Sequence, residues 1–317
     1  MGSEVLRTVA ARHRHRTFAA VTREPHRALC LGPNVIPVDF DELAGNRAPV
    51  LVCVADNEAL ALRSCTDVER SRFAVATRNH RLIAAHLGSR MWRDRPVLVV
   101  TNPVELFCAK LAEVTGHDSV FGVGMQLDAQ RCRDVLAIGW QIDLEPDELP
   151  VTGMHGLEPI PVLSAVPGLA ERISAEPWEK VTARLQAAAN SFQPKWIRHP
   201  ERMAAMFERR GQLPANDPHR RVGVAVAALT VAEFDGDQPP VARAIGHVAG
   251  LVDAWLDGGS VPVAGPCRTG GELVYLGGTA ELPNGKFRVP DLCPVESELV
   301  AGQVTRMRAL TAKVEAA

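Results

Sequence analysis

The sequence lacks the features that would place the chain in a membrane, a disulfide framework or a nucleic-acid complex. No apolar run is long enough to span a bilayer, and the start lacks the basic and then apolar pattern of a secretory signal. The seven cysteines are scattered and include no CxxC pair, which favours reduced thiols in the cytoplasm over disulfides or a zinc site. The formal net charge of -2 gives no reason to expect nucleic acid or an anionic membrane as partner. We therefore expect a cytoplasmic protein with no metal.

The first half of the chain alternates apolar strand-like runs with helical patterns. The 317 residues, 46% of them hydrophobic, suffice for two domains or one large domain with a sizeable core. Three short runs predict strands, at 17–21, 49–54 and 96–100, and two amphipathic patterns predict helices, at 2–12 and 72–87. Continuous Val/Leu runs without polar alternation are typical of strands buried on both faces of a parallel sheet. The fold class is therefore α/β, with a doubly wound sheet domain over 1–122.

The second half has a different character and predicts an α+β domain over 123–317. A helix starts near Leu127, a turn-rich segment follows at 145–168, and a charged stretch covers 194–221. Three more helices are expected, at 177–192, about 240–256 and 296–316, together with short strands at 261–264 and 272–276.

Three polar residues in this second half suit the chemistry of a carboxylic acid. Asp128 and Arg131 lie three residues apart, so they share one face of a helix, whereas Arg133 lies off that face. A guanidinium can bind a carboxylate through two parallel hydrogen bonds. His155 precedes Gly156 in a turn, and a carboxylate close to a histidine can fix its tautomer and stabilise its charged form. Taken singly, an Asp/Arg pair of this spacing is more often a surface ion pair, and a lone histidine is more often structural.

The ordered combination of motifs resembles the lactate/malate dehydrogenase family. Val99–Val104 is similar to the strand-end motif of that family, and Leu127–Arg133 is similar to its LDxxRxR helix. Gly153–Val162 is similar to its histidine-glycine segment, and Arg70–Arg72 is similar to the arginine of its mobile loop. The match runs almost without gaps from about 70 to 165. The resemblance implies a Rossmann-type sheet domain followed by an α+β catalytic domain.

The resemblance also implies roles at the substrate. His155 would protonate the keto oxygen of a 2-keto acid, or act as the base in the reverse reaction, and Asp128 would orient it and raise its pKa. Arg131 would bind the substrate carboxylate. Arg72, on a loop that closes over the substrate, would polarise the carbonyl and help to exclude water. The implied reaction interconverts a small 2-keto acid and its L-2-hydroxy acid.

The resemblance also implies a nicotinamide cofactor, which is NAD, with NADP as the alternative. It implies that the chain assembles as a homodimer or homotetramer. Asn102 would hydrogen-bond the carbonyl region and help to place the nicotinamide, and Thr101 and Gly2 would complete the cofactor contacts. The cofactor half departs from the family pattern, because no strand followed by GxGxxG is present and Gly2 is the only remaining glycine of that motif. This absence predicts an unpaired sheet edge.

Four further positions depart from the family pattern. Thr22-Arg23 stands where an acid would bind the adenine ribose, and Asp56 stands near the expected diphosphate. Thr66 occupies the position that distinguishes pyruvate from oxaloacetate, and Val241 replaces a threonine near the nicotinamide.

Two explanations remain open. In one, the start of the chain was misread, the missing strand lies upstream, and the chain is a dehydrogenase for an atypical substrate. In the other, the chain has lost dinucleotide binding and binds a small carboxylate or a protein partner.

Overall fold

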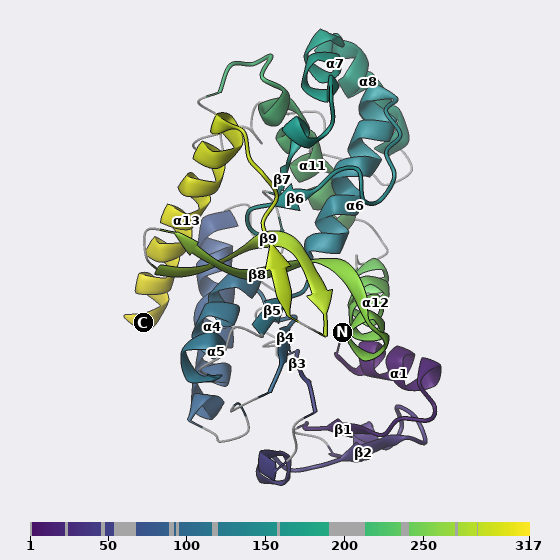
Figure 1. Cartoon of the computed structure of the whole chain (residues 1–317), viewed down its shortest axis with the longest axis vertical. Helices are drawn as coiled ribbons and strands as arrows, with labels where there is room; N and C mark the ends of the chain where they lie inside the picture. The colour runs from purple at the N-terminus through teal and green to yellow at the C-terminus, as the bar shows by residue number, and fades with distance from the viewer. Residues whose placement is uncertain are drawn as a thin grey trace.

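The structure is a computed structural model of the chain (Figure 1). It describes residues 2–22, 25–45, 48–53, 68–88, 92, 95–115, 120–156, 159–189, 213–235, 241–269, 272–283 and 285–317. Across these ranges, no helix combines the length and the apolar character needed to cross a bilayer.

A six-stranded mixed sheet forms the centre of the molecule (Figure 1). Its parallel part consists of β3 (Val50–Val52), β4 (Val97–Val99) and β5 (Val120–Gly122). Its antiparallel part consists of β8 (Gly259–Thr269), β9 (Glu272–Leu282) and β10 (Lys286–Arg288). The strand order is β10-β9-β8-β5-β4-β3, and β5 pairs with β8 where Gly122 faces Ala264. Strands from both halves of the sequence therefore share one sheet.

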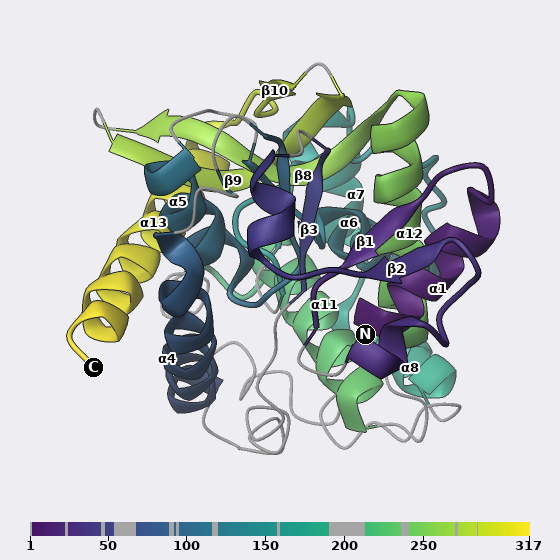
Figure 2. The same cartoon turned by 90° about the horizontal axis from the view of Figure 1, so that it is seen from below.

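Both faces of this sheet are covered, which explains why its strands lack polar alternation. Val97 and Val99 of β4 pack into one core, which also includes α5 (Val104–Thr115), while Leu98 packs into a second core on the opposite face. This second core receives α1 (Gly2–Arg12) and α12 (Val241–Asp257), which lie side by side in Figures 1 and 2. On the α5 side, α4 (Val68–Leu87) packs against α13 (Pro294–Glu315).

The N-terminal strands form a separate layer. β1 (Phe18–Ala20) pairs in parallel with β2 (Val35–Pro37), and among the described residues neither strand pairs with the six-stranded sheet. The short helix α2 (Pro25–Ala28) lies between them in sequence, and the 3-10 helix η1 (Asp41–Gly45) follows. In the part of the chain that the structure describes, β3 is the last strand at its side of the central sheet.

A group of helices from the second half of the chain packs against the sheet, where α6 contacts β8. The helix α6 (Met125–Val135) continues into a π-helical turn, η4 (Leu136–Trp140), and α8 (Trp178–Ala189) packs against that turn. The paired strands β6 (Val151–Thr152) and β7 (Ile160–Pro161) lead through η5 (Leu163–Ala165) to α7 (Leu169–Ala175). The helix α11 (Pro218–Asp235) lies against α6 and α7.

The α/β fold class predicted from the sequence is confirmed, with one correction. The strands expected at 261–264 and 272–276 are longer, because β8 and β9 pair with each other along their whole length. Within the stretch expected to be charged up to 221, α11 begins at Pro218 with His219, Arg220 and Arg221 in its first turn. The domain boundary at 122/123 stays a prediction, although β8, β9 and β10 extend the sheet of the first half.

Candidate active site

The structure places His155 directly against Asp128. His155 Nδ1 lies 2.7 Å from Asp128 Oδ2, and the same oxygen accepts the Gly156 N–H at 3.1 Å. The Asp128 side chain is fully buried, whereas that of His155 retains 13% of its exposure. Two sequence segments 27 residues apart therefore meet with an imidazole at the edge of a buried carboxylate.

Arg131 completes a buried charged group with these two residues. Its guanidinium donates to Asp128 Oδ1 at 3.2 Å, one helical turn along α6, and its side chain is 3% exposed. The expectation that Asp128 and Arg131 share a helix face is confirmed. Arg133 points elsewhere, to the Pro146 carbonyl oxygen. A buried carboxylate between a guanidinium and an imidazole has partners on both oxygens, which is the condition for holding a charge in the interior.

Glu105 of α5 contacts the same group. This residue lies in the first turn of α5, is 2% exposed, and accepts the His155 N–H through Oε1 at 2.5 Å. Thr101 and Asn102 lie between β4 and α5, so they are close in sequence to the residue that holds the His155 backbone. The Asn102 carbonyl oxygen accepts a hydrogen bond from Asn79 of α4 at 2.8 Å. The helix that follows the strand-end motif therefore contacts the histidine segment.

Two glycines allow the histidine to lie where it does. Gly124, at the N-cap of α6, has φ of +132°, and a Cβ at this position would overlap the His155 ring. Gly153 has φ of +81°, and a Cβ there would overlap the Gln303 side chain. Both positions combine a backbone conformation that suits glycine with a close approach to a side chain. A larger residue at either position would clash, so both Gly124 and Gly153 are needed for the histidine to lie where it does.

Residues of α13 and β9 also hold the backbone of the histidine segment in place. Gln303 of α13 is 2% exposed and accepts the Met154 N–H through Oε1 at 2.9 Å. Gly277 of β9 donates to the Gly153 carbonyl oxygen at 2.8 Å, and its own carbonyl oxygen accepts the Thr152 hydroxyl at 2.8 Å. Elements from three parts of the chain thereby fix the backbone at His155.

The surroundings of His155 raise its pKa. Burial alone lowers the pKa of the imidazole, but the charge and hydrogen bond of Asp128 raise it, and Glu105 adds to this rise. Arg131 opposes them, and the net shift is upward from the usual value of about 6.5. The surroundings therefore favour the protonated form of the ring, with Asp128 at its Nδ1 side.

The residues expected at the cofactor are only partly brought together. Gly2 begins α1 and lies beside Cys53, the residue after β3, with 3.3 Å between a Cβ placed on Gly2 and the Cys53 sulfur. Thr101 is buried and Asn102 is exposed, both at the carboxyl end of β4. Thr22 is exposed after β1. Asp56, Thr66 and Arg23 and the side chains of Arg72 and Val241 lie outside the described residues.

The sequence analysis missed Glu105, Gly124 and Gln303. A carboxylate inside the apolar run Val104–Cys108 was the available signal for Glu105, because charged side chains are rarely buried without a partner. The glycine just before the α6 pattern was a weaker signal for Gly124. No local signal marks Gln303, since its partner Met154 lies 149 residues away in the sequence.

Comparisons with known proteins agree with these observations. No family model matches the chain. A malate dehydrogenase of Methanococcus maripaludis is 26% identical over 127 residues, which cover 37% of this chain and 40% of that protein. An L-2-hydroxycarboxylate dehydrogenase (NAD(P)(+)) of Methanocaldococcus jannaschii is 26% identical over 140 residues, covering 40% and 45%. The chain thus matches less than half the length of these relatives.

Solved structures extend the similarity in fold to nearly the whole chain. The lactate dehydrogenase of Cryptosporidium parvum, solved with lactic acid and nicotinamide adenine dinucleotide, covers 99% of this chain and 95% of its own, with a TM-score of 0.65 and 15% identity. The malate dehydrogenase of the same organism covers 100% and 96%, with a TM-score of 0.63 and 14% identity. The chain therefore resembles lactate/malate dehydrogenases in part of its sequence and has their fold.

Proposed function

We propose that the protein is an oxidoreductase of the lactate/malate dehydrogenase type, acting on CH–OH donors. It would interconvert a 2-keto acid and an L-2-hydroxy acid with a nicotinamide cofactor. The observation that carries this proposal is the buried group of Asp128, Arg131 and His155, in which Glu105 of α5 holds the His155 backbone. It offers a proton donor and a carboxylate-binding cation next to each other.

His155 acts as the acid in reduction and as the base in oxidation. Because Nδ1 faces Asp128 at 2.7 Å, the proton exchanged with the substrate oxygen moves at Nε2. Asp128 keeps the ring in one orientation and stabilises its protonated form. Glu105 holds the backbone of the same residue, so both the ring and the main chain are fixed before the substrate arrives.

Arg131 binds the substrate carboxylate. The guanidinium presents its N–H donors as a planar fork that matches the geometry of a carboxylate, and the bond to Asp128 Oδ1 orients this fork. Replacing Arg131 with Lys removes the two parallel hydrogen bonds but keeps the charge. We expect the KM for the keto acid to rise at least about tenfold, and an unchanged KM would remove Arg131 from this role.

Arg72 is proposed as a second cation over the carbonyl, on the resemblance alone.

The described residues at the carboxyl ends of β3 and β4 fit part of a dinucleotide. The N-terminus of α1 lies next to the residue after β3, and helix N-termini favour phosphate groups. Gly2 permits close approach there, and Glu4 in the first turn is ion-paired with Arg7. Thr101 and Asn102 would contact the nicotinamide end. When bound, NAD or NADP would supply the hydride acceptor or donor.

The other partners are proposals of the same kind. A small 2-keto or 2-hydroxy acid is the substrate, and a homodimer or homotetramer is the assembly that the resemblance implies. We place the protein in the cytoplasm because seven cysteines without a CxxC pair suit a reducing compartment. Light scattering coupled to gel filtration measures the assembly directly.

Cofactor binding and turnover test the proposed function separately. NADH and NADPH are titrated against the chain by fluorescence, and NADH oxidation is followed with a panel of 2-keto acids. We expect binding of at least one cofactor and turnover of one acid in the panel. Binding of a 2-keto acid without any cofactor binding or turnover would contradict the enzyme and support a carboxylate-binding protein.

A further inference from the structure

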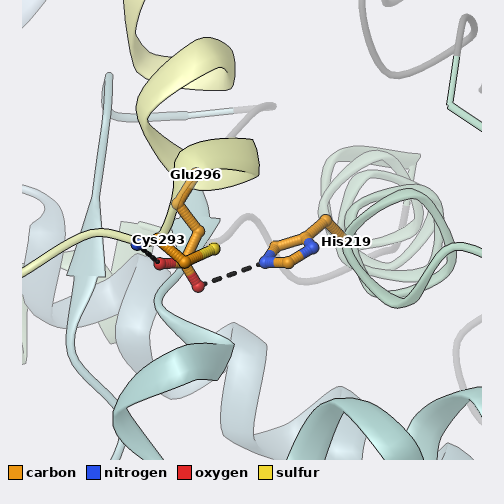
Figure 3. A group of neighbouring side chains, drawn as sticks. All are labelled: His219, Cys293 and Glu296. Carbon is orange, nitrogen blue, oxygen red and sulfur yellow. Dashed lines mark hydrogen bonds and ion pairs between the residues drawn. The ribbon is translucent and has the colours of Figure 1, made fainter.

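Three potential metal ligands meet away from the candidate active site. His219 of α11, Cys293 at the N-cap of α13 and Glu296 in the first turn of α13 place one ligand atom each within 4.8 Å of one another (Figure 3). His219 is 7% exposed and Glu296 is fully buried. In Figure 3 the Cys293 sulfur and one ring nitrogen of His219 are turned toward the Glu296 carboxylate. We propose that His219, Cys293 and Glu296 bind a zinc-class divalent cation.

Helix capping explains only part of this arrangement. Cys293 and Glu296 form a capping box, in which the Cys293 N–H donates to Glu296 Oε2 at 2.9 Å and the Cys293 sulfur accepts the Glu296 N–H. Ser164 also donates to both carboxylate oxygens, at 3.0 and 2.6 Å. None of these contacts requires a buried imidazole. His219 comes from a different helix, and its Nε2 lies 3.1 Å from Glu296 Oε1.

The hydrogen bonds of His219 indicate which nitrogen would bind the metal. In a neutral ring with the proton on Nε2, which donates to Glu296, the buried Nδ1 has no hydrogen-bond partner. It also faces Asp217 Oδ1 at 3.6 Å, so two acceptors point at each other. With a cation on Nε2, the proton moves to Nδ1 and points at the Asp217 carboxylate. Carboxylates commonly orient metal-binding histidines in this way.

The distances and ligand types select the metal. Zinc bonds to nitrogen and oxygen of about 2.0–2.2 Å place two ligand atoms of a tetrahedral site about 3.3 Å apart. The 3.1 Å between His219 Nε2 and Glu296 Oε1 is close to this value. A sulfur and an imidazole nitrogen suit zinc or cobalt and exclude magnesium and calcium, which prefer oxygen. Three protein ligands leave a fourth position for water.

The cation would connect two helices to the segment that carries His155. Glu296 binds Ser164 of η5, and two turns further along α13, Gln303 holds the Met154 N–H. A metal that fixes α11 against the start of α13 therefore stabilises the support of His155 from outside the active site. The cation contacts no residue of the proposed reaction, so the failure of either proposal leaves the other standing.

Cobalt provides a direct test, because a cobalt–thiolate bond produces a near-ultraviolet charge-transfer band. We treat the full chain with a chelator, titrate it with Co²⁺, and then displace the cobalt with Zn²⁺ against a chromophoric chelator. We expect the charge-transfer band, one zinc per chain, and a higher melting temperature with zinc. Cys293→Ser should abolish the band and weaken zinc binding by at least about 100-fold. Serine is a preferred N-cap, so this variant keeps the α13 cap.

Two variants provide controls. Cys267→Ser changes a half-buried cysteine on β8 and should leave the band intact. Asp217→Asn keeps a residue that can cap α11 but removes the charge facing Nδ1, and should weaken zinc binding about tenfold. Absence of the band and of stoichiometric zinc in the wild type would overturn the proposal. The group would then be a hydrogen-bonded helix cap without a metal.

Discussion

The cluster around His155 and the layer of β1, α2 and β2 are built in opposite ways. In the cluster, the polar side chains are buried and bonded to partners from several elements: Asp128 to His155 and Arg131, and Glu105 to the His155 backbone. In the N-terminal layer, three-residue strands pair with each other alone among the described residues. The large apolar side chains Val21, Leu29 and Ile36 are exposed there, at 40%, 63% and 46%.

The difference shows that the fold fixes the positions of the side chains around His155 more closely than those of the N-terminal layer. A buried carboxylate is costly unless every lone pair has a partner, so its neighbours are fixed by several contacts at once. An exposed apolar side chain has no such requirement, and its replacement changes the free energy of unfolding little. We therefore expect substitutions in the cluster to act on geometry and chemistry, and substitutions in the N-terminal layer to have small effects.

The largest effect is expected from His155→Asn. Loss of the acid–base group should lower turnover by about 10²- to 10⁴-fold, because general acid–base catalysis contributes about that much. Steady-state NADH oxidation with the best keto acid measures this loss. A fluorescence titration should give unchanged NADH binding, which separates the chemical role from a loss of folding. Residual turnover above about a tenth of the wild-type rate would show that another group supplies the proton.

Gly124→Ala tests whether the backbone is built around the histidine. A methyl group at φ of +132° adds backbone strain and overlaps the His155 ring, so the free energy of unfolding should fall by about 2–4 kcal/mol. Gly168→Ala is the matched control, because Gly168 also has positive φ at a helix N-cap but has open space around its Cβ. It should cost only the strain, about 1 kcal/mol. Equal losses in urea unfolding would mean that the ring can move aside.

The pH dependence of reduction tests the charges around the ring. Because the pKa of His155 is raised, the protonated acid persists to higher pH, and the rate of reduction should fall only as pH passes the raised pKa. Asp128→Asn should move this fall to lower pH, and Glu105→Gln should move it less while still accepting the His155 N–H. Rate profiles of the three proteins decide this, and an unshifted profile in Asp128→Asn would exclude Asp128 as the main cause.

The same shift predicts how stability depends on pH. A histidine whose folded pKa lies above its unfolded value stabilises the protein fully below the unfolded pKa. This contribution is lost as pH rises through the folded pKa. The wild type should therefore lose stability over that window relative to His155→Asn, and urea unfolding at several pH values measures the difference.

The smallest effect is expected from Ile36→Thr in β2. This side chain is 46% exposed, and threonine suits a strand, so the free energy of unfolding should change by no more than about 0.5 kcal/mol. A loss above 1 kcal/mol, measured by urea unfolding at several protein concentrations, would mean that this face is covered in solution. The comparison between the two regions would then need revision.

The candidate site was predictable to the extent that its residues carry local patterns. Asp128 and Arg131 form a helix pair readable from their spacing, and the order of the motifs indicated that His155 belongs with them. Glu105 and Gln303 were not found, because each acts on a backbone N–H far away in the sequence. Hydrogen bonds between a side chain and a distant backbone group leave no periodic trace.

Local patterns in the sequence were enough to predict the α/β class and the strands β3 and β4, because apolar runs and helical periodicity depend on local burial. The sequence also contains the residue types that the proposed reaction requires. The joining of β8, β9 and β10 to the sheet of the first half depends on the tertiary structure, and so does the pairing of β1 with β2 alone among the described residues. The tertiary structure also decided that His219 meets Cys293 and Glu296. These outcomes depend on contacts between distant segments, whose partners are selected by packing rather than by local sequence.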